Sequence, residues 1–406
     1  MSVDVPQPAP ETRNEFPLLS PRCWHGMRTW GYLRMLAKNR FRVHPRRWPM
    51  AALLLPISGI NSLLFGIQEL LYGRQIRGTR IEQAPVFVLG HWRTGTTYLH
   101  RLLACDDRFA YPTLYDSMAA NHFVLTAPLV KKLLQGLLPK QRPMDKMSIN
   151  LDDPEEDEFA QVAMGGPTIL YRMAFPNHPV PHTEWLDMEG VSDQDRQRFQ
   201  HGFLWFLKAL TFLKKKRLVL KYPGQTGRIG LLAEMFPQAR FVHLTRNPSE
   251  IFPSTRRNWE AMDFTQGFQI PHHKHLDEFI YETLTRMYRG FERQRKKIDP
   301  AMICDLRYEE LVRDPIGQLS AVYAQLDLGD FEYVRSRLES EVAAQKKYRA
   351  SSYALAPKVQ AELQRRWGFY MEKYGYPDTA RSSSSDQSCT PSRRPGSVAS
   401  RATPLL

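Results

Sequence analysis

Two segments of this chain have residue types and spacings suited to binding the anionic groups of a nucleotide. The first is GHWRTGTT, residues 90–97, in which Gly90 and Gly95 frame a turn between an apolar run and a helical pattern. Glycines let successive backbone N–H groups converge on an anion, and the dipole of the following helix adds to the attraction. Arg93 lies at the crown of the turn. Thr96 occupies the position where a Walker A loop carries its lysine, which argues against phosphoryl transfer from ATP with Mg²⁺.

The second segment follows a later apolar run and contains a well-marked helix start. Arg246 ends that run, and Asn247 and Pro248 then supply a helix N-cap and a first helical residue, with Glu250 as the capping-box partner. Ser254 lies about two helical turns further along the chain. An arginine and a hydroxyl that converge at the carboxyl end of a strand would suit a second phosphate.

The elements that must position these segments alternate along the chain from residue 85 onward. We expect strands at residues 86–89, 218–220, 240–244 and 301–303, because buried parallel strands read as continuous apolar runs. Helical patterns between them imply right-handed crossovers. The predicted fold is therefore α/β, with a P-loop-like, mostly parallel sheet flanked by helices and a helical insertion over residues 115–215.

Composition divides the chain into four parts. Residues 1–25 read as a disordered leader, residues 26–80 as a basic and amphipathic helical segment, and residues 81–376 as the α/β domain. Residues 377–406 are rich in Ser, Arg and Pro, a low-complexity composition that cannot bury enough apolar surface to fold. We therefore predict a disordered tail.

Charge and cysteine content limit the partners and the compartment. The net charge is +14, which favours an anionic partner such as a nucleotide or an acidic membrane surface. No nucleic-acid-binding signature accompanies that charge, so we expect no nucleic-acid partner. The four cysteines have no metal-ligand or paired spacing, which predicts a reducing, cytoplasmic location without structural zinc or disulfides.

Residues 48–72 are strongly apolar and flanked by arginines. A membrane-spanning helix needs about 20 mostly apolar residues, but Pro56 and several polar residues interrupt this stretch. Its second half places five apolar side chains on one helical face: Leu63, Leu64, Ile67, Leu70 and Leu71. We expect an amphipathic helix that either packs on the domain or lies on a membrane surface, so membrane association is left open.

Together, the loop and the Arg246–Ser254 pair resemble the two phosphate-binding elements of sulfotransferases that use 3′-phosphoadenosine 5′-phosphosulfate (PAPS). The resemblance extends to residues 218–248 (LVLKYPGQTGRIGLLAEMFPQARFVHLTRNP) and 305–315 (DLRYEELVRDP), and residues 154–160 (PEEDEFA) resemble a motif of the bacterial branch. It covers about residues 84–376. The chain is accordingly identified as a candidate member of that family, with PAPS as the donor co-substrate and no metal.

The resemblance also implies roles for particular residues. The loop would hold the 5′-phosphosulfate through six residues: Gly90, Arg93, Thr94, Gly95, Thr96 and Thr97. Arg246 and Ser254 would hold the 3′-phosphate, and Tyr308 matches a tyrosine near the adenine. Lys221, at the end of the second expected strand, would neutralise the sulfuryl or bridging oxygen together with Arg93. A basic stretch at residues 346–349 falls where the family folds over the nucleotide.

The general base departs from the family pattern. Relatives often carry a histidine shortly after the lysine, whereas this chain has Gln225, which cannot accept a proton at neutral pH. The acidic cluster at residues 155–158 is the best replacement, because crowded carboxylates raise one another's pKa. If a helix continues through Phe159, Glu155 and Glu158 share one face. We favour Glu156 or Glu158 as the base, without separating them.

The resemblance implies transfer of the sulfuryl group from PAPS to a hydroxyl or amine, with release of 3′,5′-ADP. The acceptor would be a small or lipid-like molecule. Three residues of the insertion fit either a partly hydrophobic acceptor pocket or ordinary core packing: Tyr115, Phe123 and Trp205. Three alternatives remain. They are a P-loop nucleotide kinase, a non-enzymatic basic module, and a homologue that binds PAPS but is catalytically impaired because Gln225 replaces the histidine.

Overall fold

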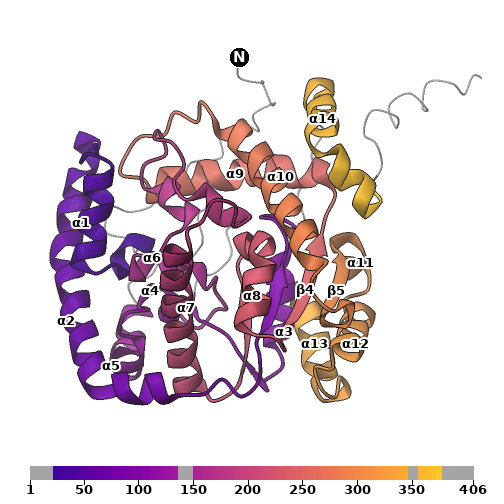
Figure 1. The fold of residues 1–406 in the computed structure, drawn as a ribbon, viewed down its shortest axis with the longest axis horizontal. Helices are drawn as coiled ribbons and strands as arrows, with labels where there is room; N and C mark the ends of the chain where they lie inside the picture. The colour runs from indigo at the N-terminus through magenta and orange to yellow at the C-terminus, as the bar shows by residue number, and fades with distance from the viewer. Residues whose placement is uncertain (1–21, 136–149, 346–354, 377–406) are drawn as a thin grey trace, which may run out of the picture.

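A five-stranded parallel sheet forms the centre of the computed structural model, which describes residues 22–135, 150–345 and 355–376. The strand order is β2-β3-β1-β4-β5. The strands are β1 (Val86–Leu89), β2 (Phe109–Ala110), β3 (Arg217–Lys221), β4 (Arg240–Thr245) and β5 (Ile303–Arg307). Helices flank this sheet on both faces, which confirms the predicted α/β class (Figure 1).

The α-helices connect and cover the strands. They are α1 (Thr29–Lys38), α2 (Trp48–Gly78), α3 (Thr96–Ala104), α4 (Leu114–Met118), α5 (Phe123–Gln135), α6 (Glu158–Met164), α7 (Asp193–Lys214), α8 (Ile229–Met235), α9 (Pro248–Gln266), α10 (Leu276–Arg295), α11 (Tyr308–Arg313), α12 (Pro315–Leu326), α13 (Glu332–Gln345) and α14 (Pro357–Tyr374). Short 3₁₀ turns include η1 (Cys23–Gly26), η2 (Pro45–Arg47) and η5 (Pro223–Arg228).

The sheet separates two apolar cores because successive side chains of a strand point to opposite faces. Phe87 and Leu89 of β1 belong to the larger core, which they share with α1, α2 and α6–α10. Val86 and Val88 belong to the smaller core, which α3, α12 and α13 cover. Both faces of the sheet are therefore buried, which is why its central strands read as continuous apolar runs.

The carboxyl ends of the parallel strands bring the predicted chemistry to one edge of the sheet. The crossover after β1 places α3 on the smaller core, whereas the crossover after β3 places α8 on the larger one. Such a change of side beside β1 opens a crevice at the strand ends, where ligands bind in open α/β sheets. Gly90, Lys221 and Arg246 end or follow β1, β3 and β4 there.

Three of the four expected strands are confirmed, and the fourth is displaced. The segment 301–303 was expected to be a strand, but β5 begins at Ile303 and runs to Arg307, while residues 300–302 form a 3₁₀ turn. Among the residues that the structure describes, β5 is an edge strand that pairs with β4 alone. It carries the charged Asp305, which contacts His243 (2.7 Å) and Arg295. The two-residue strand β2 was not predicted.

The N-terminal helices share the larger core with the α/β domain. Residues 22–25, which we expected in the leader, are folded: Trp24 is buried, and Arg22 Nε donates to the carbonyl of Thr265 at 2.7 Å. The expected tail beyond residue 376 lies outside the described residues.

Helix α2 differs from its prediction in two respects. It continues without a break past Pro56, from Trp48 to Gly78. It packs on the domain against α1, α5 and α7, but the apolar face named in the prediction points away from them, with Leu63 65% and Leu70 85% exposed. By length and composition it is the one helix among the described residues that could cross a membrane, although a protein core helix can pass the same test.

Candidate functional site

The loop between β1 and α3 is held in a shape that requires its glycines. Gly90 has φ +146° and Gly95 has φ +97°, values that other residues rarely adopt. A Cβ on Gly90 would lie 2.6 Å from the carbonyl oxygen of Leu244, and one on Gly95 would lie 2.3 Å from Cδ2 of Tyr308. The loop is thus pressed against β4 and α11, and the unpaired N–H groups of the first turn of α3 form its floor.

The six loop residues divide into two groups. Thr94 is buried and its Oγ1 donates to the carbonyl of His91 (2.7 Å), while the N–H of Gly90 donates to Oγ1 of Thr226 (2.8 Å). These contacts fix the shape of the loop. Thr96 and Thr97, by contrast, line the cavity beside it, together with Arg93.

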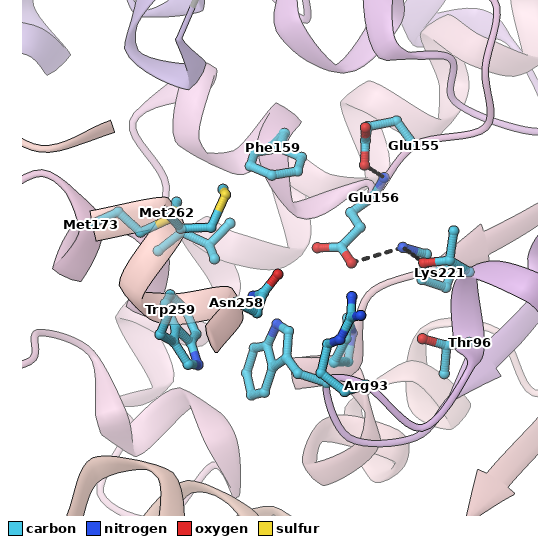
Figure 2. Close-up of a pocket in the computed structure, with 14 residues that line it drawn as sticks. Arg93, Thr96, Glu155, Glu156, Phe159, Met173, Lys221, Asn258, Trp259 and Met262 are labelled. Carbon is cyan, nitrogen blue, oxygen red and sulfur yellow. Dashed lines mark hydrogen bonds and ion pairs between the residues drawn. The ribbon is translucent and has the colours of Figure 1, made fainter. Parts of the chain in front are cut away.

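Lys221 and Glu156 form an ion pair at the mouth of the loop. Lys221 ends β3, and its Nζ lies 2.7 Å from Oε1 of Glu156 and 3.4 Å from Oγ1 of Thr97. The side chain of Lys221 is 3% exposed and that of Glu156 is 16% exposed. Figure 2 shows the Glu156 carboxylate directed into the same space as the guanidinium of Arg93. A proton acceptor and two cations therefore meet beside an anion-binding loop.

Glu155 also lines the cavity, where its Oε1 accepts from the N–H of Glu156 at 2.9 Å, but Asp157 and Glu158 do not. Helix α6 begins at Glu158, so the expected shared face of Glu155 and Glu158 does not form. Both carboxylate oxygens of Glu158 accept hydrogen bonds from Arg228, each at 3.0 Å, and this pair is fully buried. A buried bidentate pair of this kind holds α6 against η5.

Asp157 has a perturbed pKa. Desolvation by burial, followed by the charge of the neighbouring Glu158, raises its pKa to about 7. Gln225, at the position where the resemblance led us to expect a histidine, donates its side-chain N–H to Oδ2 of Asp157. Both side chains are buried, so Gln225 anchors the acidic segment instead of facing the cavity.

The Arg246 segment is joined to the loop. Asn247 caps α9 as predicted, with its side chain accepting from the N–H of Ser249. Nη1 of Arg246 donates to the carbonyl of Arg93 (2.9 Å), and its guanidinium lies 4.4 Å from the ring centre of Tyr308. Nε of Arg93 donates to Oγ of Ser254 at 2.9 Å. The two predicted phosphate-binding elements therefore form one connected network.

A cavity of about 670 Å³, which includes space open to solvent, extends from the loop toward α6 and α9. Its far wall is apolar, and Asn258 adds one amide (Figure 2). The apolar lining residues are Trp92, Phe159, Leu170, Met173, Trp259 and Met262. Sequence reasoning did not name this wall, although residues 258 and 262 follow Ser254 at intervals of four and so share its face of α9.

The predicted acceptor residues do not line this cavity. Tyr115 and Phe123 are buried in the larger core, and Trp205 packs against Phe65 of α2. Of the two alternatives for these residues, the structure shows core packing and not the acceptor pocket. The basic stretch at residues 346–349 lies outside the described residues, so its predicted role is not placed. Across residues 22–135, 150–345 and 355–376, no group of three or more His, Cys, Asp or Glu is arranged to hold a metal ion.

Comparison with known proteins agrees with this geometry. A sequence model of the sulfotransferase family matches residues 85–332. The omega-hydroxy-beta-dihydromenaquinone-9 sulfotransferases Stf3 of Mycobacterium bovis and Mycobacterium tuberculosis are each 38% identical to the chain over 356 residues, which is 87% of this chain and 91% of theirs.

Two solved structures share the fold. Sulfotransferase STF9 from Mycobacterium avium superposes with a TM-score of 0.64 at 18% identity, covering 82% of this chain and 86% of STF9. Sulfotransferase STF1 from Mycobacterium tuberculosis superposes with a TM-score of 0.56 at 19% identity, covering 83% and 89%. The predicted resemblance to the bacterial branch is confirmed: the chain belongs to the sulfotransferase family and is an enzyme that transfers a sulfuryl group.

Proposed function

We propose that the chain transfers the sulfuryl group of PAPS to the hydroxyl of a lipid-like acceptor, with Glu156 as the general base. The observation that carries this proposal is the Lys221–Glu156 pair, 2.7 Å long, at the mouth of the glycine loop. It combines a proton acceptor with a fixed cation in a largely buried site, where electrostatic interactions are stronger than in water.

The residues present fit the donor. The loop leaves no room for a Cβ at Gly90 or Gly95, and the first turn of α3 offers N–H groups to an anion. We assign the 5′-phosphosulfate to this loop with Thr96, Thr97 and Arg93. PAPS supplies an activated sulfuryl group, and 3′,5′-ADP is its leaving group. We propose that this chemistry needs no metal, because Lys221, Arg93 and the loop N–H groups neutralise the oxygens that carry negative charge.

The 3′-phosphate is assigned to Arg246 and Ser254. Arg246 is at the carboxyl end of β4 and Ser254 is on α9, and each of them is hydrogen-bonded to Arg93, so we propose that both contact one phosphate from two elements. Tyr308, which stacks beneath the Arg246 guanidinium, borders this region on the side assigned to the adenine.

Glu155 and Glu156 both line the cavity; the Glu156 carboxylate lies 2.7 Å from Nζ of Lys221, whereas the Glu155 carboxylate accepts from the N–H of Glu156. In the proposed step it takes the proton of the acceptor O–H as the acceptor oxygen bonds to sulfur and the bond from sulfur to the phosphate oxygen breaks. Glu158 is committed to Arg228, and Asp157 lies behind the cavity wall. The replacement of histidine by Gln225 therefore moves the base to another element and leaves the enzyme competent.

The acceptor is proposed from the cavity wall and from the relatives. Aromatic and thioether side chains beyond Glu156 suit the hydrocarbon part of an amphiphile, with Asn258 placed to hydrogen-bond a polar group. The 38% identical relatives are named for an omega-hydroxylated dihydromenaquinone. We propose a lipid-like alcohol of this chemical class, reached by peripheral contact of residues 48–72 with a membrane.

Isothermal titration calorimetry tests the donor assignment. The wild-type protein should bind 3′,5′-ADP more tightly than ATP with Mg²⁺. Arg246→Ala should weaken 3′,5′-ADP binding by at least about tenfold, because it removes a charge-assisted contact to the 3′-phosphate. Arg313→Ala, at an exposed arginine on α11, is the matched control and should bind as wild type does. Tighter binding of ATP with Mg²⁺, or unchanged binding by Arg246→Ala, would overturn the assignment.

A further inference from the structure

The buried polar side chains of helix α2 are Ser58, Asn61 and Gln68, and each of them is hydrogen-bonded. Nδ2 of Asn61 donates to the carbonyls of His25 (2.6 Å) and Met27 (3.0 Å). Gln68 donates to the carbonyl of Asn121 and accepts from the N–H of Leu125, both at 3.1 Å. Burying polar groups is tolerated only with such partners. The inward face therefore fixes α2 on the protein in one orientation.

The outward face of α2 is apolar along most of its length. It forms a stripe at helical spacing that consists of Ala52, Leu55, Pro56, Gly59, Ile60, Leu63, Gly66, Ile67, Leu70 and Leu71, all exposed. From Leu55 to Leu71 this stripe runs for about 24 Å. Trp30 of the adjoining helix α1 is 77% exposed as well. An exposed apolar patch of this extent marks an interaction surface.

Arginines lie at both ends of this stripe. Arg46 precedes the helix, Arg74 and Arg77 lie in its last turns, and Arg80 follows it, all exposed. Beside the start of α2 is an open cavity of about 1560 Å³. It is lined by Arg42, Arg46, Arg47, His44 and His272, with no carboxylate in its lining. Within the described residues, no acidic side chain forms an ion pair with Arg42, Arg46 or Arg74.

We propose that this face of α2 lies in the plane of an anionic phospholipid surface, with the apolar stripe among the upper acyl chains and the terminal arginines among the phosphates. An apolar stripe bounded by arginines is the pattern of an interfacial helix. The helix does not cross the bilayer, because its inward face is bonded to η1 and α5. This inference specifies the peripheral contact proposed above and rests on it.

The arrangement places the membrane near the proposed acceptor site. The turn η1 packs against both α2 and α6, and α6 carries Phe159 of the cavity wall. Figure 1 shows α1 and α2 along one edge of the molecule and α11–α13 at the opposite edge. A membrane-bound alcohol would therefore approach from the α2 side, and α11 offers control positions far from it.

Flotation of the full-length protein with vesicles tests the inference. Vesicles of phosphatidylcholine with phosphatidylglycerol should bind the protein, and vesicles of phosphatidylcholine alone should bind at least about fivefold less because they offer no charge to the arginines. The double variant Leu63→Asn, Leu70→Asn should lose at least about tenfold in vesicle affinity, since two exposed leucines no longer enter the acyl region. The matched control Val312→Asn, at an exposed residue of α11, should bind as wild type does.

Two further measurements separate the possible outcomes. Size-exclusion chromatography with light scattering tests whether the stripe instead pairs with a second copy of the chain. A dimer that dissociates when Leu63 and Leu70 are substituted would overturn the proposal. Vesicle binding that is unchanged by these substitutions would also overturn it. The 3′,5′-ADP titration is the second measurement. Variants that bind 3′,5′-ADP normally but not vesicles support the docking surface, whereas a wild type that fails to bind 3′,5′-ADP refutes the proposed function itself.

Discussion

Replacement of Glu156 by glutamine removes the proposed proton acceptor and changes little else in the site. Glutamine has the same length, and its Oε1 can still accept the hydrogen bond that Lys221 Nζ now donates at 2.7 Å. The variant loses only the negative charge and the ability to take a proton. We expect kcat to fall by two to four orders of magnitude, the usual contribution of general base catalysis.

The binding of the donor should respond in the opposite direction. The expected fall in kcat of Glu156→Gln corresponds to about 3–5 kcal/mol of lost transition-state stabilisation, and donor affinity should not fall with it. Lys221, with a side chain only 3% exposed, would be left without its counter-charge. Its attraction for an anion would then be unopposed, so 3′,5′-ADP should bind as tightly as to wild type, or more tightly. A catalytic loss without a binding loss distinguishes a base from a residue that merely shapes the site.

The assay combines ³⁵S-labelled PAPS with a long-chain alcohol for turnover, and calorimetry with 3′,5′-ADP for binding. Circular dichroism should confirm that the variant is folded, because an unpaired buried lysine also lowers stability. Glu158→Gln is the contrasting variant: it breaks the buried pair with Arg228, so its melting temperature should fall while the folded fraction keeps its kcat. A Glu156→Gln enzyme with more than about a third of wild-type kcat would refute Glu156 as the base.

Three further changes have distinct expected outcomes. Gly95→Ala should lower the melting temperature by several degrees and abolish 3′,5′-ADP binding, because the new Cβ would lie 2.3 Å from Tyr308 and residue 95 has φ +97°. The control Gly202→Ala, whose Cβ would meet no atom within 4 Å, should leave the melting temperature unchanged or higher in the same thermal scan. Ser254→Ala should weaken 3′,5′-ADP binding about three- to tenfold by calorimetry with no change in melting temperature, and equal binding would remove Ser254 from the site. Asp157 has a folded-state pKa of about 7, above its ordinary value of 3.8, so the folded protein holds more protons between these values and loses stability as pH rises through that window. Asp157→Asn should flatten this dependence, by up to about 4 kcal/mol, in urea unfolding between pH 4 and 8, and an unchanged slope would contradict the assigned shift.

The parts of the fold that were predictable are those in which local pattern and burial agree. β1, β3 and β4 lie inside the sheet, with both faces covered, so their sequences are mostly apolar. β5 lies at the edge of the sheet and has Asp305 among its apolar residues. The apolar run in the sequence therefore predicted a shorter strand that begins earlier than β5 does. β2 has only two residues and carries no pattern of its own.

The candidate site was predictable where one backbone segment supplies it, and less so where distant segments meet. The glycine loop and the capped start of α9 are local features, and both were located correctly. Choosing among the carboxylates at residues 155–158 was not a local question. It depends on Arg228 taking Glu158 and Gln225 taking Asp157, contacts between residues about 70 positions apart in the chain.

The orientation of helix α2 also could not be predicted from its own sequence. Periodicity identified its apolar stripe correctly, but not which way the stripe would point. The polar residues that made the helix look interrupted are the ones that dock it, because Asn61 and Gln68 find backbone partners on η1 and near α5. A pattern in the helix alone cannot reveal partners that another segment provides.

The hydrogen bond from Arg93 to Ser254 has a consequence for nucleotide selection. The loop arginine donates to the same hydroxyl that is assigned to the 3′-phosphate. A nucleotide with a 3′-phosphate can take over Ser254 and leave the guanidinium free to turn toward the other end of the molecule. ATP has a 3′-hydroxyl in that place and offers no charge in exchange. In the proposed arrangement, binding of the 3′-phosphate by Ser254 therefore frees the Arg93 guanidinium to contact the reacting end of the donor.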